Sequence, residues 1–311
     1  MQNTNKLIAI FLQCHDFYVA FENYMDQKGL NTNIKANHTQ TSTRLHPSEI
    51  MTIVIFYHMA GFKCFKYYYN QYICAGLKSY FPAAPSYSRF TELAKQVNLP
   101  LYMFVAMQGL LHNSSNCYID STKLAVCDNH RIHQHKVFKG LAQRGKTSMG
   151  WFYGLKLHVI INAKGALISF CFSAGNVSDN NKEIVGYLCR YLQNGVKVFG
   201  DAGYVSQNLF DMLYKQGITF ITKIRKNMKN KLLTLKDKWL LKKRTLVETA
   251  IDLWKHIGDL WHTRHRSVDN AFNNVLACLA AYHFNDHKPS SKMSKKTIFV
   301  TTPKIILASN L

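Results

Sequence analysis

The spacing of apolar residues changes at residue 116, and this change divides the chain into two kinds of local structure. Before it, apolar side chains recur every three to four positions, which is typical of helices that bury one face. The second of the four segments with this spacing opens with proline and glutamate, which suit the first turn of a helix. The segments are 5–26, the stretch beginning at His46-Pro47, 64–77 and 88–111. We therefore predict a small all-helical module over residues 1–112.

After residue 116, apolar and polar residues alternate as they do in half-buried strands. A predicted strand over 117–126 is followed by a predicted hairpin, whose arms 151–162 and 166–174 are joined by Ala163-Lys164-Gly165. A capping pattern from Ser178 to Glu183 predicts a helix start. The remaining predicted elements are short strands at 196–200 and 218–224 and helices at 206–216, 237–260 and 267–284.

This order of elements fits one open sheet with helices packed against it. We therefore predict an α/β fold for residues 113–286, with a mixed sheet flanked by helices. The basic and polar stretch 287–311 is expected to be a loose tail.

The charge of the chain indicates an anionic partner. Lysine and arginine number 39 against 17 aspartates and glutamates, so the formal net charge is +22. Thirty of the 39 basic residues lie after residue 110, so the charge belongs mainly to the predicted α/β region. A surface this cationic favours nucleic acid as the partner, with an anionic membrane surface as the second choice.

The location predicted from the sequence is the cytoplasm. No run of 18 apolar residues is present, and the first residues lack the pattern of a secretory signal. The eight cysteines form no CxxC pair and mostly lie among apolar neighbours, as expected for reduced, buried thiols. We therefore expect no membrane partner.

Two local patterns resemble known sites but lack the context that those sites need. Residues 140–147 match the phosphate-loop pattern GxxxxGK[ST], yet no buried strand precedes them and no helix follows. Cys127, His130, His133 and His135 could suggest zinc, but no second ligand pair is present. The sequence favours a basic loop near a phosphate backbone, with histidines that are solvated or contact phosphate.

Three carboxylates form the stronger signal. Asp120 lies in the core of a predicted strand, where a charge is costly without a partner, and Asp201 follows a strand at the sheet edge where α/β folds bind ligands. Glu248 has Arg244 four residues before it and Lys255 seven after it, all on one helix face. Taken alone, Glu248 and Arg244 would form an ordinary solvated ion pair.

Taken together, the three carboxylates suggest a metal centre. Acidic residues are scarce in this region, since residues 129–178 contain none. Carboxylate oxygens suit Mg²⁺ or Mn²⁺, and two such ions would stabilise the attacking and leaving oxygens of a phosphoryl displacement. We therefore expect Asp120, Asp201 and Glu248 to meet in the folded chain.

Several segments resemble the DDE-type transposases of bacterial insertion sequences, and most closely the insertion-sequence-982 group. The matching segments lie between about residues 116 and 285, and their order and combination are specific to that family. They are Tyr118-Ile-Asp-Ser-Thr122, 135–140 with 144–158, Gly175-Asn-Val177, Phe199-Gly-Asp-Ala-Gly-Tyr204 and Arg244-Thr-Leu-Val-Glu-Thr249.

The resemblance implies an RNase H-like fold with Asp120, Asp201 and Glu248 as a metal-binding catalytic triad, using Mg²⁺ or Mn²⁺ and two ions. Related transposases carry a signature of Tyr, Arg, Glu and Lys around the glutamate, which Arg244, Glu248 and Lys255 fit. Leu241 occupies the tyrosine position, so no role of that tyrosine is carried over.

The activity implied is cleavage of the ends of an insertion sequence followed by strand transfer into target DNA. The partners implied are double-stranded DNA and a second copy of the chain, in a bacterial cytoplasm near the nucleoid. Phosphate contacts do not read sequence, so recognition of the ends is assigned to the helical module. The residues expected to contact DNA are Lys136, Lys139, Arg144, Lys146, Lys223, Arg225, Lys226, Arg244 and Lys255.

Three other functions remain open from the sequence. A decayed transposase would bind DNA without metal-dependent nicking, and a nuclease with the same triad would nick without joining strands. A phosphate-loop NTPase would hydrolyse nucleotides in a reaction that depends on Lys146.

Overall fold

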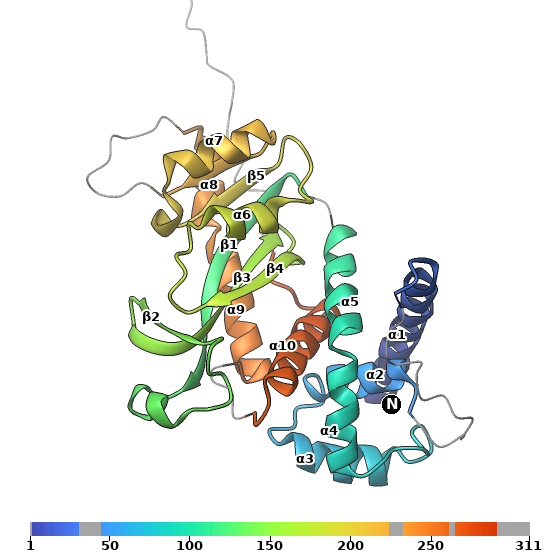
Figure 1. Cartoon of the computed structure of the whole chain (residues 1–311). Coiled ribbons are helices and arrows are strands. Elements are labelled where there is room, and N and C mark those ends of the chain that lie inside the picture. Colours follow the sequence, from blue (N-terminus) through green and yellow to red (C-terminus); the bar gives the residue numbers. More distant parts are fainter. Residues whose placement is uncertain (1, 31–44, 113, 224–232, 261–264, 291–311) are drawn as a thin grey trace, which may run out of the picture.

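The computed structural model describes residues 2–30, 45–112, 114–223, 233–260 and 265–290 (Figure 1). The first part is the expected helical module. It comprises α1 (Gln2–Gln27), α2 (Pro47–Tyr57), α3 (Phe65–Tyr67), the π-helical turns η2 (Tyr68–Gly76), α4 (Tyr87–Gln96) and α5 (Asn98–Leu110). His46 caps α2, and the Glu49 side chain accepts a hydrogen bond from the His46 backbone, so the predicted helix start is confirmed.

The second part is built on a mixed sheet, which has six strands among the described residues. The strands are β1 (Asn116–Cys127), β2 (Gln143–Thr147), β3 (Gly150–Asn162), β4 (Leu167–Ala174), β5 (Lys197–Gly200) and β6 (Thr219–Thr222). On one side β1 pairs antiparallel with β3, whose far edge carries β2 and β4. On its other side β1 pairs parallel with β5, which pairs parallel with β6. The predicted strands and the β3–β4 hairpin are confirmed.

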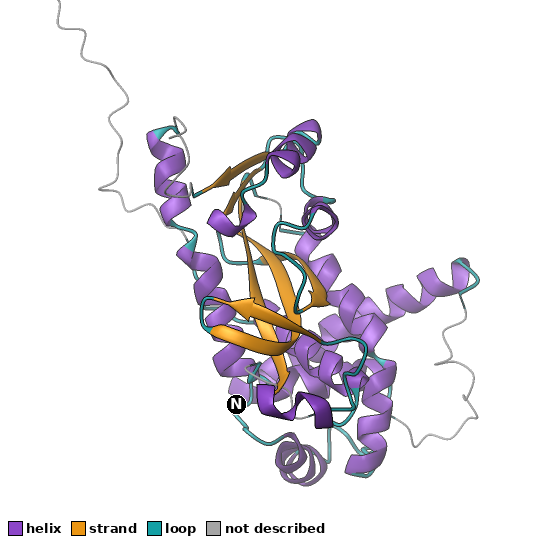
Figure 2. Cartoon of the chain, turned by 60° about the vertical axis from the view of Figure 1, so that its left-hand side comes forward, coloured by secondary structure: helices purple, strands orange, loops and turns teal. Residues whose placement is uncertain are grey.

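Helices cover both faces of this sheet (Figure 2). Alternate residues of β1 point to opposite faces. Ile119 is buried with Val185 of α6 (Lys182–Cys189), beside α7 (Gln207–Lys215). Tyr118 is buried in the cluster that includes Val247 of α9 (Thr245–Gly258) and residues of α10 (Val268–His283). The expected α/β fold with a mixed sheet flanked by helices is therefore confirmed.

The predicted long helix over 237–260 is wrong in one respect. Two helices occupy this stretch, α8 (Leu235–Lys242) and α9, and they meet at Lys243 and Arg244. The Lys243 backbone N–H closes the last turn of α8 on the carbonyls of Trp239 and Leu240, and Arg244 then occupies the N-cap position of α9 without a side-chain capping bond. Because apolar side chains continue on both sides of the break, their spacing did not reveal it. The break places the Arg244 side chain at the start of α9.

The helix expected to start within Ser178–Glu183 begins later than the capping pattern suggested. The N-cap is Asn181, whose side chain accepts hydrogen bonds from the backbone N–H groups of Glu183 and Ile184. Asp179 is consequently free of the capping role. It lies in the loop before α6, where it makes contacts of a different kind.

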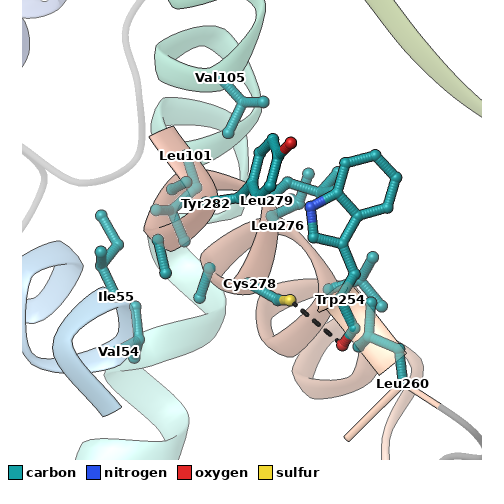
Figure 3. Close-up of a cluster of buried hydrophobic side chains, with 14 of the residues drawn as sticks. Val54, Ile55, Leu101, Val105, Trp254, Leu260, Leu276, Cys278, Leu279 and Tyr282 are labelled. Atoms are coloured by element: carbon teal, nitrogen blue, oxygen red, sulfur yellow. Dashed lines mark hydrogen bonds between the residues drawn. The ribbon is translucent and has the colours of Figure 1, made fainter. Parts of the chain in front are cut away.

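The helical module and the sheet region share a continuous core. Figure 3 shows Ile55 of α2 and Leu101 of α5 in the same cluster of buried side chains as Trp254 of α9 and Tyr282 of α10. The rings of Trp254 and Tyr282 meet edge to face with centroids 5.2 Å apart. The predicted division at residue 112 therefore crosses a packed region. In the described part of the chain, no helix has the length and apolar character needed to cross a bilayer.

Candidate active site

The first expected site residue, Asp120, lies in the middle of the central strand. It is opposite Val159 of β3, on the face that α9 covers. The Ser121 backbone N–H donates a hydrogen bond to Asp120 Oδ1, and the side chain is only 18% exposed. A buried carboxylate of this kind needs a cationic partner or additional hydrogen bonds to remain charged.

Asp201 follows directly after β5, the parallel neighbour of β1. It caps the short 3₁₀ turn η4 (Ala202–Tyr204), and its Oδ1 accepts a hydrogen bond from the Gly203 N–H at 2.8 Å. β1 and β5 run parallel, and Tyr118 pairs with Phe199. Asp120 and Asp201 each follow this pair by two residues, so they lie at neighbouring positions along the two strands.

Glu248 stands in the first turn of α9 and connects to Asp120 through Arg244. The Arg244 Nη1 atom lies 3.1 Å from Asp120 Oδ2, and Nη2 donates to Glu248 Oε1. The Arg244 side chain is 11% exposed, so its guanidinium is enclosed between the two carboxylates. The structure thus brings two of the expected residues to one cation.

The charge of Asp201, the third carboxylate, acts on Asp120. Burial raises the pKa of the Asp120 carboxyl to about 6, while Arg244 and the Ser121 N–H act to lower it. The charges of Asp201 and Glu248 add to the rise. Burial also raises the pKa of Tyr204 well above its usual value, and the charges of Asp120 and Asp201 contribute to this rise.

The donor chemistry of this cluster fits a divalent cation. Asp120, Asp201 and Glu248 offer carboxylate oxygens, the ligands that Mg²⁺ and Mn²⁺ prefer. Among the described residues, however, no three His, Cys, Asp or Glu side chains are grouped closely enough to hold an ion together. The Arg244 guanidinium neutralises Asp120 and Glu248 in the structure, so an ion held by these two carboxylates would compete with it.

Sequence comparison identifies the family of the chain. Residues 112–268 match the sequence model of the transposase DDE domain. The chain belongs to the DDE transposase family. A solved piggyBac transposase, in a synaptic complex with hairpin DNA, is similar at 11% identity and a TM-score of 0.49, covering 81% of this chain and 70% of that one. No curated protein matches the chain.

Within the DDE domain, a fourth carboxylate, which the sequence did not single out, is hydrogen-bonded to the residue next to Asp120. Asp179 Oδ1 accepts hydrogen bonds from Ser121 Oγ at 2.8 Å and from Lys156 Nζ at 3.0 Å. Lys156 also donates to the Val177 carbonyl at 2.8 Å, and the residue is 8% exposed. The pair therefore ties the loop before α6 to the residue next to Asp120. A lysine within the apolar run of β3 was the signal, because such a residue needs a buried counter-ion.

The candidate DNA-contacting residues occupy different environments. Lys136, Lys139, Arg144 and Lys146 are exposed along the segment between β1 and β3, and Lys223 is exposed after β6. Lys255 is half-buried on α9. Arg244 is the exception, since its charge is directed at Asp120 and Glu248. Arg225 and Lys226 lie outside the described residues.

Within the DDE domain, the phosphate-loop pattern and the Cys127–His135 pattern do not have the geometry of the sites that they resemble. Gln143–Thr147 of the phosphate-loop pattern is strand β2, and the chain continues through a turn into β3 without forming a helix N-terminus. His130 and His133 lie in the 3₁₀ helix η3 (Asn129–Gln134), after Cys127 and before His135. These four side chains do not form a metal-binding group among the described residues. Residues 140–147 therefore lack the strand–loop–helix geometry that a phosphate loop needs.

Proposed function

We propose that this chain is the transposase of a bacterial insertion sequence, of the insertion-sequence-982 group, and that it cuts the ends of its element and joins them to target DNA. Membership of the DDE transposase family supports the general activity. The bridge from Arg244 to Asp120 and Glu248, with the charge of Asp201 acting on Asp120, is the observation that carries the assignment of the site.

Asp120, Asp201 and Glu248 are the residues that would hold one or two Mg²⁺ or Mn²⁺ ions. Bound there, such ions would stabilise the charge that develops on the phosphate in the transition state and would activate the attacking hydroxyl. The residues themselves hold the site in shape. Ser121 fixes one Asp120 oxygen through its backbone, and Gly203 fixes one Asp201 oxygen in the same way.

The basic residues of the DDE domain would position the DNA. Lys136, Lys139, Arg144 and Lys146 follow β1 and have no acidic residue near them in the sequence. Contacts of this kind attract and orient a duplex without reading its bases. Recognition of the ends then belongs to the helical module, and two copies of the chain would hold the two ends of the element. This function places the protein with the bacterial nucleoid.

The test uses duplexes that carry the inverted repeats flanking the gene, incubated with the full-length protein with and without Mg²⁺. Metal-dependent nicks at the repeat boundary together with joined products support the proposal. Nicks without joined products would identify a nuclease, and binding without nicks would identify an inactive DNA-binding protein. Either result would contradict the proposed function.

Asp179 is expected to support this site without touching DNA. Replacing it in Asp179→Asn removes the counter-ion of the buried Lys156 and weakens the link to Ser121. Cleavage is expected to fall roughly 10- to 100-fold, as for other residues that orient a metal ligand. The affinity for a duplex end should stay unchanged, and thermal unfolding should shift to lower temperature because Lys156 loses its counter-ion.

A double variant separates positioning from simple loss of stability. Asp179→Asn combined with Lys156→Met removes both charges, so the melting temperature should recover toward that of the wild type. Cleavage should stay low, because the link between the loop and Ser121 is still weakened. Cleavage that recovers together with stability would show that Asp179 serves only the fold.

A further inference from the structure

The hairpin of β2 and β3 presents one cationic face and one buried face. Opposite residues of an antiparallel pair point to the same side, so the pairs Lys146–Trp151 and Arg144–Tyr153 share a face. The other face is packed, since a Cβ atom added at Gly145 would lie 2.1 Å from the Gly175 carbonyl oxygen. The packing fixes which side of the hairpin is exposed. Figure 1 shows β2 at the edge of the molecule opposite helices α1–α5.

The Trp151 ring makes cation–π contacts with both Arg144 and Lys146. The Arg144 guanidinium carbon lies 4.9 Å from the centroid of the Trp151 ring, and Lys146 Nζ lies 5.6 Å from it. The tryptophan is itself 51% exposed, and its backbone carbonyl accepts a hydrogen bond from Asn129 at 2.9 Å. Cation–π contacts of this kind orient flexible side chains while leaving their charge accessible. Among the described residues, neither Arg144 nor Lys146 forms an ion pair.

This face points to the same side of the sheet as the catalytic carboxylate. Asp120 is opposite Val159, and Trp151 precedes Val159 by eight residues on the same strand, so both alternate to one side. Eight residues of strand span about 26 Å, and B-form DNA rises about 3.4 Å per base pair, so for a duplex that lies along β3 the separation corresponds to about eight base pairs. A duplex cut at the carboxylates is long enough to reach the hairpin.

We propose that Arg144 and Lys146, oriented by Trp151, bind the phosphate backbone of duplex DNA about eight base pairs from the bond that is cut. The distance rests on the proposed function, because it is counted from the catalytic carboxylates. The contact between the hairpin and DNA does not depend on the proposed function. Charge complementarity selects the occupant, since residues 129–178 carry seven lysines and arginines and no acid. Trp151 is a positioning residue in this arrangement.

The test measures binding of a random-sequence duplex of roughly 30 base pairs as a function of salt, in the full-length protein. Arg144→Ala with Lys146→Ala should lower the slope of log affinity against log salt by about 1.8, because two phosphate contacts are lost. Trp151→Ala should leave the slope nearly unchanged but weaken binding about fivefold, and Trp151→Phe should restore most of that loss.

A matched control lies on the opposite side of the sheet. Arg190, at the end of α6, has its guanidinium carbon 3.8 Å from the Tyr187 ring centroid and 4.4 Å from that of Tyr191. Arg190→Ala removes a comparable cation–π arrangement and should leave both affinity and slope unchanged. If Arg190→Ala lost as much affinity and slope as the double variant, DNA would respond to any surface cation equally. That result would overturn the inference.

Footprinting on an inverted-repeat end tests the distance. Wild-type protein should protect backbone about eight base pairs from the cut, and the double variant should lose that protection alone. Wild-type slope and footprint in the double variant would overturn the inference even if the wild type cuts its ends. A lowered slope in a protein whose wild type does not cut would support the hairpin contact and reject the proposed function.

Discussion

Each of the substitutions Asp120→Asn, Asp201→Asn and Glu248→Gln is expected to reduce strand cleavage by at least about 10³-fold, or about 4 kcal/mol in activation free energy. Each change keeps the shape of the side chain and removes one negatively charged carboxylate ligand. The remaining two carboxylates cannot neutralise a divalent cation as well, so the charge that develops at the phosphate loses its stabilisation. The measurement is nicking of the inverted-repeat duplex with Mg²⁺ present.

Binding of the same duplex should persist in all three variants, because the basic surface is unchanged. The matched control is Asp252→Asn, which removes an exposed carboxylate one turn after Glu248 on the same helix. This control should cut at the wild-type rate. If Glu248→Gln also cut at that rate, Glu248 would be an ordinary helix-surface residue, and the DDE assignment would lose its third member.

Local patterns were sufficient to predict most of the secondary structure. The alternation over 117–126 and the Ala163-Lys164-Gly165 turn predicted β1 and the β3–β4 hairpin, because strand period and turn chemistry are both local. The break between α8 and α9 was not visible, since Leu240 and Val247 are buried on either side of it and keep the apolar stripe continuous. The spacing of apolar residues shows which residues face the core. It does not reveal a helix break that leaves the same residues facing the core.

Some residues of the candidate site stood out in the sequence and one neighbouring residue did not, and this difference has a physical cause. Asp120, Asp201 and Glu248 stood out because each is a carboxylate in an apolar or cationic setting. Asp179 did not, because its role depends on partners 58 and 23 residues away, Ser121 and Lys156. The capping pattern also offered a local explanation for it, which the Asn181 cap now replaces. Side-chain pairing across a sheet depends on the strand register, which no single segment encodes.

Arg244→Ala is expected to destabilise the metal-free protein by about 3–5 kcal/mol, which lowers its melting temperature by about 10 °C. The substitution leaves the buried Asp120 carboxylate facing Glu248 without the guanidinium between them. Mg²⁺ should then stabilise the variant more than the wild type. In the wild type a bound ion would have to displace Arg244, whereas in the variant it would meet two unneutralised carboxylates. Thermal unfolding with and without Mg²⁺ measures this difference directly, independent of cleavage.

The comparison needs a control that loses an ion pair elsewhere. Lys95→Ala removes the exposed pair with Glu92 on α4, which should contribute less than about 1 kcal/mol and should not alter the response to Mg²⁺. Arg244→Lys keeps the charge but loses the two-pronged geometry, so its response should fall between those of the wild type and Arg244→Ala. Equal Mg²⁺-induced shifts in the wild type and Arg244→Ala would mean that the ion does not bind between Asp120 and Glu248. Arg244 would then be a permanent part of the fold, and the carboxylates would need another cation site.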